Sequence, residues 1–129
     1  MLRYSESRLY VFQIQRDTGV WESVEYSSFA VGPESDKYRL SVSGFSGDTG
    51  DALAAPAHSA STGNGMKFTA PGQDNDNDPN GQCANGTKGW WFNYCSRSSL
   101  NSWQATVWNA YTTEMSSNVV FSRIMVKLD

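Results

Sequence analysis

Residues 57–102 form a long stretch dominated by Ser, Gly, Asn, Asp and Pro, and this stretch most restricts what the chain can fold into. Loops of such length are uncommon inside compact domains, where they are usually functional or disordered. Two features argue against disorder here: the aromatic cluster at residues 90–92 and the presence of both cysteines of the chain. We therefore expect an ordered, irregular lobe that carries the function, because loops held by a rigid scaffold usually do.

The two cysteines of this lobe, Cys83 and Cys95, favour a disulfide over a metal site. Two thiols alone cannot form a tetrahedral zinc site, and the single histidine, His58, is distant in the sequence. A local disulfide would stabilise the fold by roughly 3 kcal/mol in the chain-entropy model and indicates an oxidising, extracellular compartment. The glycosylation sequon at residues 85–87 is consistent with secretion, whereas residues 1–20 lack the apolar segment of a signal peptide.

Three segments before the lobe have the pattern of β-strands. Residues 8–17 and 20–32 are rich in β-branched and aromatic residues, and the turn sequence Asp17-Thr18-Gly19 between them predicts a hairpin. Residues 37–45 predict a third strand. The apolar side chains of this third strand fall on one face: Tyr38, Leu40 and Val42.

The C-terminal segment, residues 119–128, is the most hydrophobic part of the chain. Its length and β-branched content predict a central strand that is buried on both faces. The core residues expected from it are Phe121, Ile124, Met125 and Val126. Ahead of the lobe, residues 50–55 predict a short helix that is capped by Asp48 or Thr49 and ended by Pro56.

Together these patterns predict an α+β, mainly β, fold: a central antiparallel sheet with short helices and an irregular, disulfide-tied lobe. We expect one domain over residues 1–129, with a sheet subdomain at about 8–56 plus 119–128 and the lobe at about 57–118. Hydrophobic residues make up only 39% of the chain, but the 13% that are aromatic can fill a lean core. The net charge of −3 and the scattered Lys and Arg argue against nucleic-acid binding. No apolar run is long enough for a transmembrane helix, so we expect no membrane insertion.

The acidic run DNDNDPNGQC, residues 74–83, places a carboxylate at every second position: Asp74, Asp76 and Asp78. Carboxylates so close together repel one another unless a cation lies among them. An EF-hand loop is excluded because Pro79 stands where that loop needs Gly and Asn85 stands where it needs Glu. We favour a calcium site of another kind, which takes carboxylate and carbonyl oxygens; a solvated acidic turn is the alternative.

Several segments in order resemble the fibrinogen-like C-terminal domain family: YSSFAVGPESDKYRL, KYRLSVSGFSGDTGDAL, NGMKFTAPGQDNDND, CANGTKGWWFNYC, SSLN and MSSNVVFSRIMVKL. The resemblance covers roughly residues 8–128. It implies a central antiparallel sheet into which the C-terminal strand is inserted, and an adjoining lobe with one calcium ion and a ligand pocket. It also implies the disulfide between Cys83 and Cys95. The family's N-terminal subdomain has no counterpart here, so we expect either a compact version or a piece of a longer protein.

The resemblance also implies which residues form the calcium site and the ligand pocket. The side chains of Asp76 and Asp78 would bind calcium together with the carbonyls of Asn80 and Gly81; Gln82 is a further candidate. The pocket beside the second cysteine recognises acetyl groups in many lectins of the family. Its expected residues here are Tyr94, Cys95, Ser96, Trp103, Trp108 and Tyr111.

Four further expectations concern this pocket and its surroundings. The resemblance implies that the Tyr94–Cys95 peptide bond is cis, so that its N–H turns toward the ligand. Ser96 stands where family lectins frequently have His, and the wall-forming segment 101–108 is short. At least one of Trp90 and Trp91 is expected to pack in the core rather than against a sugar.

The function predicted on these grounds is that of a secreted, calcium-dependent, acetyl-recognising lectin in innate recognition or cell adhesion, and its partners would be glycans or acetylated ligands. The alternative is a protein-interaction module of the cell surface, extracellular matrix or clot that uses the same pocket. A third interpretation is a structural scaffold that has lost its pocket. An oligomer is compatible with the sequence. An enzyme is not expected, because His58 is the only histidine and no G-x-S-x-G motif is present.

Overall fold

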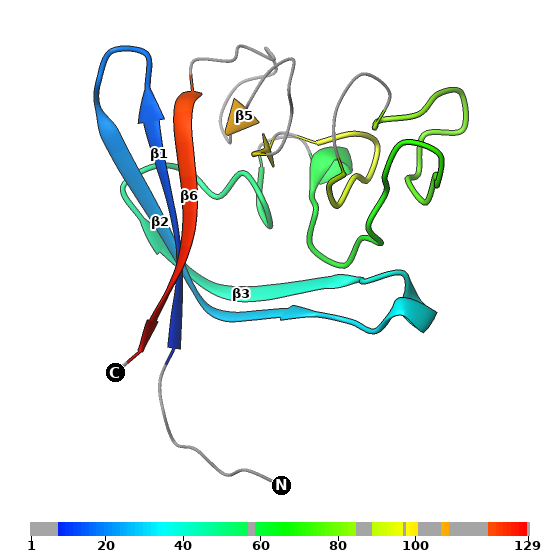
Figure 1. Cartoon of the computed structure of the whole chain (residues 1–129), viewed down its shortest axis with the longest axis horizontal. Helices are drawn as coiled ribbons and strands as arrows, with labels where there is room; N and C mark the ends of the chain where they lie inside the picture. Colours follow the sequence, from blue (N-terminus) through cyan, green and yellow to red (C-terminus); the bar gives the residue numbers. More distant parts are fainter. Residues whose placement is uncertain are drawn as a thin grey trace, which may run out of the picture.

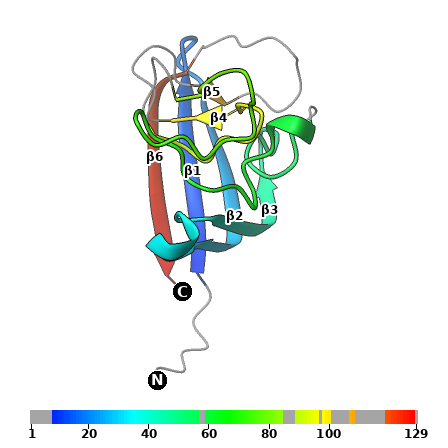
Figure 2. The ribbon, with the colours of Figure 1, turned by 90° about the vertical axis from the view of Figure 1, so that its right-hand side faces the viewer.

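A computed structural model describes residues 8–56, 59–84, 89–96, 98–100, 107–108 and 119–128. In these residues an antiparallel sheet lies beside an irregular lobe made largely of loops (Figure 1). The view turned by 90° places the lobe across one face of the sheet (Figure 2). The mainly β fold with an antiparallel sheet and a disulfide-tied lobe is therefore as predicted. None of the helices in the described ranges is long and apolar enough to cross a membrane.

The sheet has the strand order β3-β2-β1-β6, and all of its neighbouring strands are antiparallel. Its strands are β1 (Arg8–Arg16), β2 (Trp21–Val31), β3 (Leu40–Gly47) and β6 (Val119–Leu128). Two short strands in the lobe, β4 (Ser98–Ser99) and β5 (Val107–Trp108), pair with each other. The short helices of the described residues are single 3-10 turns, η1 (Glu34–Asp36) and η2 (Ser59–Ser61).

The predicted hairpin is formed by β1 and β2. Its turn is closed by backbone hydrogen bonds from Arg16 to the Val20 carbonyl (2.8 Å) and from Gly19 to the Arg16 carbonyl (2.9 Å). Gly19 has a φ of 89°, a conformation that costs glycine little and other residues more. The register pairs Phe12 with Val24, and both side chains belong to the core beneath the lobe.

The β2–β3 hairpin bends at Ser27 and Gly44. The buried positions of β2 are even-numbered before this point, as at Tyr26, and odd-numbered after it, as at the half-buried Phe29. Gly44 has a φ of 73°, and a Cβ there would overlap the Ser27 hydroxyl and lie 2.9 Å from the Ser27 Cβ. Gly44 is therefore required for the bend, which carries the far ends of both strands beneath the lobe (Figure 1).

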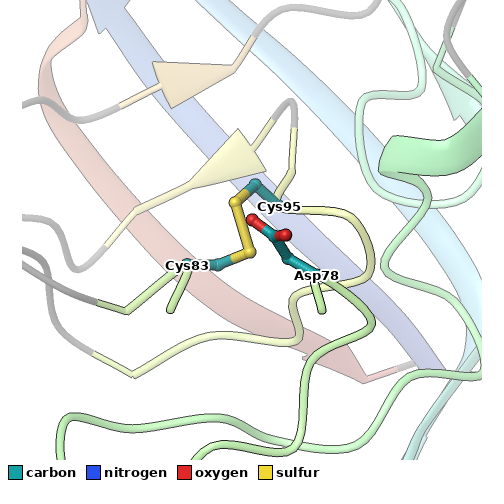
Figure 3. A group of neighbouring side chains, drawn as sticks. All are labelled: Asp78, Cys83 and Cys95. Atoms are coloured by element: carbon teal, nitrogen blue, oxygen red, sulfur yellow. A yellow bond between two sulfur atoms is a disulfide. The ribbon is translucent and has the colours of Figure 1, made fainter. Parts of the chain in front are cut away.

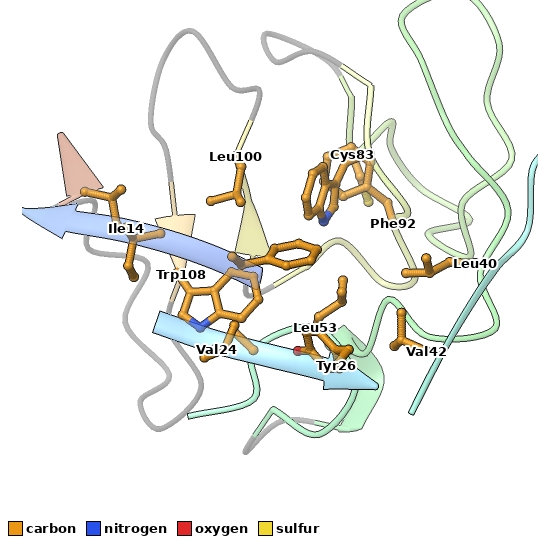
Figure 4. Close-up of a cluster of buried hydrophobic side chains, with 14 of the residues drawn as sticks. Ile14, Val24, Tyr26, Leu40, Val42, Leu53, Cys83, Phe92, Leu100 and Trp108 are labelled. Atoms are coloured by element: carbon orange, nitrogen blue, oxygen red, sulfur yellow. The ribbon is translucent and has the colours of Figure 1, made fainter. Parts of the chain in front are cut away.

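The hydrophobic core fills the space between the inner face of the sheet and the lobe (Figure 4). Its largest fully buried side chains are Trp90, Trp108, Tyr26, Phe12, Ile14, Leu40 and Leu53. Trp90 thus packs in the core as expected, and Trp91 is half-buried with its indole N–H on the Tyr38 carbonyl (2.9 Å). Of the three residues expected on one face of the third strand, Leu40 and Val42 are buried, whereas Tyr38 precedes β3 and is exposed.

The prediction that residues 119–128 form a central strand buried on both faces is wrong. Within the described sheet, β6 lies at the edge and pairs only with β1. Of the expected core residues, Phe121, Ile124 and Val126 are about half exposed and Met125 is partly buried; only Val119 of this strand is buried. A continuous apolar run indicates a strand with two apolar faces, but it does not tell whether other segments of the same protein cover them.

The predicted helix at residues 50–55 is a single turn. Only one i to i+4 hydrogen bond forms in it, from Ala55 to the Asp51 carbonyl (3.2 Å). Its cap is Asp51, whose carboxylate accepts the backbone N–H of Ala54 (2.9 Å), rather than Asp48 or Thr49. Asp48 instead accepts the backbone N–H of Ser23 (2.7 Å), so its side chain is committed to the sheet.

Candidate functional site

The amide residues of the acidic run anchor it to neighbouring segments. Asn75 donates its side-chain amide to the Phe68 carbonyl and its backbone N–H to the Thr69 hydroxyl, both at 2.9 Å. Asn77 donates its backbone N–H to the Asn93 carbonyl (2.9 Å) and its side-chain amide to the Asn93 side-chain oxygen (2.8 Å). The two amides therefore fix the run against the segments before and after it.

The carboxylate residues of the run shape its turns. Each aspartate accepts the backbone N–H of the residue two positions later: Asp74 that of Asp76 (3.0 Å), Asp76 that of Asp78 (2.9 Å) and Asp78 that of Asn80 (3.0 Å). Such local side-chain hydrogen bonds compete with regular secondary structure and hold a tight, irregular loop. The aspartates of the run thus shape the loop through local hydrogen bonds, whereas Asn75 and Asn77 attach it to neighbouring segments.

Asp76 connects the acidic loop to the disulfide. Its second carboxylate oxygen accepts the backbone N–H of Cys83 at 2.8 Å. Cys83 forms the predicted disulfide with Cys95, with the two Cα atoms 5.0 Å apart. One carboxylate therefore bridges the start of the loop and the covalent link to the segment that contains Tyr94 and Cys95.

Asp78 lies close to the disulfide (Figure 3). One of its carboxylate oxygens and the sulfurs of Cys83 and Cys95 all lie within 4.8 Å of one another. This group is no metal site as it stands, because sulfurs joined in a disulfide are not thiolates and a metal binds the thiolate. The carboxylate of Asp78 also lies against Gly81, where an added Cβ would come within 3.1 Å of its Oδ2.

The donor set of the loop fits a hard cation such as calcium. Asp76 and Asp78 are half-buried and offer carboxylate oxygens, each of which retains a lone pair after accepting one backbone N–H. Asn80, Gly81 and Gln82 are exposed residues of the same loop. Asp74 is exposed and accepts the backbone N–H of Asp76.

The segment around Cys95 is held in an unusual backbone conformation, although not the one expected. No peptide bond among the described residues is cis, so the expectation for the Tyr94–Cys95 bond is wrong. Cys95 instead has a φ of 60°, in the left-handed region that residues other than glycine rarely adopt. Backbone hydrogen bonds hold the turn, from Tyr94 to the Ala60 carbonyl (2.9 Å) and from Asn93 to the Cys95 carbonyl (3.0 Å).

The structure places the expected pocket residues in two different environments. Tyr94 is 50% exposed, and Cys95 beside it is partly exposed. Ser96 is buried, and its hydroxyl accepts the backbone N–H of Ser98 (3.1 Å). Trp108 is also buried, with its indole N–H on the Gly50 carbonyl (2.9 Å) and its ring 5.6 Å from that of Phe12.

The expectation that Ser96 and Trp108 face a ligand is therefore corrected. Ser96 organises the backbone behind Cys95, and Trp108 joins the lobe to the sheet within the core. The expected pocket residues Trp103 and Tyr111 lie outside the described residues, as do His58 and the sequon residue Asn85.

Two cavities beside the acidic loop were not predicted. One, of about 290 Å³, is lined by Glu34, Lys37, Tyr38, Phe68, Ala70, Gln73 and Asn75. The other, of about 240 Å³, is lined by Arg39, Gly65, Met66, Lys67, Asn75 and Asn77. Beside the second cavity, the hydrogen bond from Arg39 lowers the pKa of the Asp36 carboxyl. The sequence contains no signal for either cavity, because its walls come from segments brought together only by the fold.

Comparison with known proteins gives a consistent family relationship. The family model described as the C-terminal globular domain of fibrinogen beta and gamma chains matches residues 3–122. The mouse fibrinogen gamma chain is 41% identical over 99 residues, which is 69% of this chain and 22% of that protein. Human fibroleukin is 35% identical over 103 residues, which is 78% of this chain and 23% of that protein. The matched region therefore spans about a quarter of the length of these relatives.

Solved structures show the same fold. The fibrinogen-like globe domain of human ANGPTL2 superposes with a TM-score of 0.77 at 26% identity, over 94% of this chain and 58% of that chain. A lamprey fibrin D-dimer in complex with the peptide Gly-His-Arg-Pro-amide superposes with a TM-score of 0.80 at 24% identity, over 94% of this chain and 45% of that chain. At this level of identity the lamprey structure is informative about the fold alone.

Proposed function

Because this protein belongs to the family of C-terminal globular domains of fibrinogen beta and gamma chains, we propose that it is a secreted, non-enzymatic binding module with a calcium-organised ligand site beside Tyr94 and Cys95. The observation that carries the proposal is the bridge made by Asp76, which joins the acidic loop to the backbone of Cys83 and, through the disulfide, to Cys95. The acidic loop and the exposed Tyr94 are therefore parts of one connected unit.

Calcium would be held by the side chains of Asp76 and Asp78 and by the carbonyls of Asn80 and Gly81. The ion would supply positive charge that offsets the repulsion between the two carboxylates. Asp76 keeps its hydrogen bond to Cys83 in this arrangement, since each carboxylate oxygen can accept twice. A loop that is already ordered lowers the entropy cost of binding at the adjoining surface.

The proposed ligand is an acetylated sugar. Tyr94 is half exposed and offers both an aromatic face for an acetyl methyl group or sugar ring and a phenol for hydrogen bonding. Such a module would act in recognition of glycan-bearing surfaces or in adhesion, and weak single sites would gain avidity if several copies were joined.

A peptide or protein ligand at the same surface is the second candidate. Ser96 and Trp108 are buried, so among the described residues of the expected pocket only Tyr94 and Cys95 are accessible to a ligand, and such an open arrangement suits an extended peptide. The lamprey fibrin D-dimer, which shares the fold, was solved with a bound tetrapeptide amide. The ligand class is therefore a question for direct binding measurements.

The test is isothermal titration of the whole protein with N-acetylglucosamine, glucosamine and Gly-His-Arg-Pro-amide, each in millimolar calcium and in EGTA. The sugar proposal predicts that N-acetylglucosamine binds in calcium, that EGTA weakens binding at least tenfold, and that glucosamine fails. Tyr94→Ala should abolish binding, whereas Trp21→Ala, at an exposed aromatic residue on the other face of the sheet, should not.

If Gly-His-Arg-Pro-amide binds and neither sugar does, the sugar proposal is wrong and the peptide ligand is supported. Binding of N-acetylglucosamine that is equally tight in EGTA would contradict the role of calcium. No binding of any of the three ligands in calcium would contradict the proposed site.

A further inference from the structure

The chain contains three Asn-Gly pairs, and two of them lie among the described residues. Asn64-Gly65 lies in the lobe next to β3, and Asn80-Gly81 belongs to the acidic loop; the third pair, at residues 85–86, lies outside the described residues. A glycine after an asparagine favours loss of the asparagine side-chain amide, because glycine has no side chain that hinders the approach of its backbone nitrogen. The two described pairs are therefore chemically equal but differ in their surroundings.

The fold immobilises the first pair. The side-chain oxygen of Asn64 accepts the backbone N–H of Val42 in β3 (2.9 Å). The backbone N–H of Gly65 donates to the Leu40 carbonyl of the same strand (2.8 Å), and the Gly65 carbonyl accepts the Arg39 guanidinium (2.7 Å). The Asn64 amide and the Gly65 nitrogen are thus both bonded to β3, and they can react with each other only after these hydrogen bonds break.

The second pair has none of these restraints. Asn80 lies in a turn of the acidic loop, and its backbone N–H donates to the Asp78 carboxylate (3.0 Å). In the described part of the chain, neither the side-chain amide of Asn80 nor the backbone N–H of Gly81 has a hydrogen-bond partner, and both residues are exposed. No hydrogen bond therefore has to break before the two reacting groups of this pair meet.

We propose that Asn80 is a site of spontaneous covalent modification, from which the fold protects Asn64. The backbone nitrogen of Gly81 loses its proton and attacks the side-chain carbonyl carbon of Asn80. A carbon–nitrogen bond forms, the side-chain nitrogen leaves as ammonia, and a cyclic succinimide results. Water then opens the ring at either of its carbonyls and gives aspartate or isoaspartate at position 80. The net change is from amide and water to carboxylate and ammonia.

The modification changes the acidic loop itself. It adds a negative charge two residues after Asp78, so that carboxylates would stand at every second position from 74 to 80. Isoaspartate also routes the backbone through the former side chain and lengthens the loop before Cys83 by one carbon atom. The reaction needs no metal ion, so the inference is independent of the proposed function.

The test is to incubate the whole protein in EGTA at mildly alkaline pH and to map the products by tandem mass spectrometry. Water labelled with heavy oxygen marks each carboxylate that forms during the incubation. Trypsin separates the two described pairs because Lys67 lies between them, and fragment ions distinguish Asn80 from Asn85. Asn80 should convert faster than Asn64 by roughly tenfold or more, since hydrogen bonds hold only the second of these two side chains.

Two controls separate the effect of the fold from that of the local sequence. In concentrated urea both pairs lose their surroundings, so Asn64 and Asn80 should convert at similar rates. Asn80→Gln disfavours ring closure by lengthening the side chain; it should stop conversion at position 80 and leave the rate at Asn64 unchanged. Equal rates for the two asparagines in the folded protein would overturn the proposal. So would an Asn80 that converts in urea but stays intact in the folded protein.

Discussion

At the scale of single residues, the aspartates and the asparagines of the acidic run make different kinds of hydrogen bonds. Asp76 accepts N–H groups from Asp78 and Cys83, and Asn77 binds Asn93 through both backbone and side chain. Asp74 makes the same kind of turn as Asp76 but does not reach the disulfide segment. Asp74 and Asp76 therefore have different hydrogen-bond partners, although both occupy equivalent positions in the alternating sequence pattern.

This difference predicts opposite calcium responses for two matched variants. Asp76→Asn removes a carboxylate ligand and should abolish the rise in Tm on adding calcium, whereas Asp74→Asn should retain the rise. Ligand binding at 100 times its Kd stabilises a fold by about 2.7 kcal/mol, which corresponds to several degrees in a protein of this size. Thermal unfolding with and without calcium measures it, and equal loss of the response in both variants would contradict the assignment of ligands.

The residues of the candidate site could be predicted only in part from the sequence. The disulfide between Cys83 and Cys95 was predicted, because two cysteines in one loop leave few alternatives. The burial of Ser96 and Trp108 was not, since a hydroxyl or an indole suits both a pocket wall and a satisfied core position. The hydrogen-bond partner decides which position a side chain takes: Ser96 accepts from the backbone of Ser98, and Trp108 donates to the Gly50 carbonyl. These partners depend on the fold and cannot be found from the local sequence.

At the scale of elements, the strands can be predicted from the local sequence, but the segments that pack around them cannot. β1 and β2 are rich in β-branched and aromatic residues and have a glycine turn between them, so the hairpin is encoded locally. The position of β6 depends on contacts far away in sequence, and its hydrophobicity alone suggested a buried central strand. The bend in β2 and β3 likewise depends on close packing across the strands, since Gly44 leaves no room for a Cβ next to Ser27.

The bend predicts that Gly44→Ala destabilises the fold more than a matched glycine substitution does. Gly44 and Gly72 both have positive φ, at 73° and 85°, but a Cβ on Gly72 meets nothing within 4 Å. Gly72→Ala should cost about 1 kcal/mol of unfolding free energy through backbone strain. Gly44→Ala should cost roughly 1–3 kcal/mol more, because the added methyl overlaps Ser27. Urea unfolding measures both, and equal costs would show that the strand geometry adjusts without the contact.

At the scale of the whole molecule, tryptophans join the irregular lobe to the rest of the protein. The indole N–H of Trp108 donates to the Gly50 carbonyl and that of Trp91 to the Tyr38 carbonyl, so both reach segments next to β3. The aromatic content predicted that large side chains could fill the core. These side chains pack between the lobe and the sheet. The lobe lies across one face of the sheet (Figure 2), and on β6 the side chains of Ile124, Val126 and Leu128 are at least half exposed.

The most direct test of the account is a calcium titration followed by backbone amide NMR of the whole protein. If calcium binds at Asp76 and Asp78 and acts through Cys83 and the disulfide, the amides of residues 76–83 should shift together with those of Tyr94 and Cys95, with one common affinity. The strands β1 and β2 should show little change. Shifts that are absent from residues 76–83, or confined to them without any change at Tyr94 and Cys95, would contradict the claim that the ion organises the ligand surface.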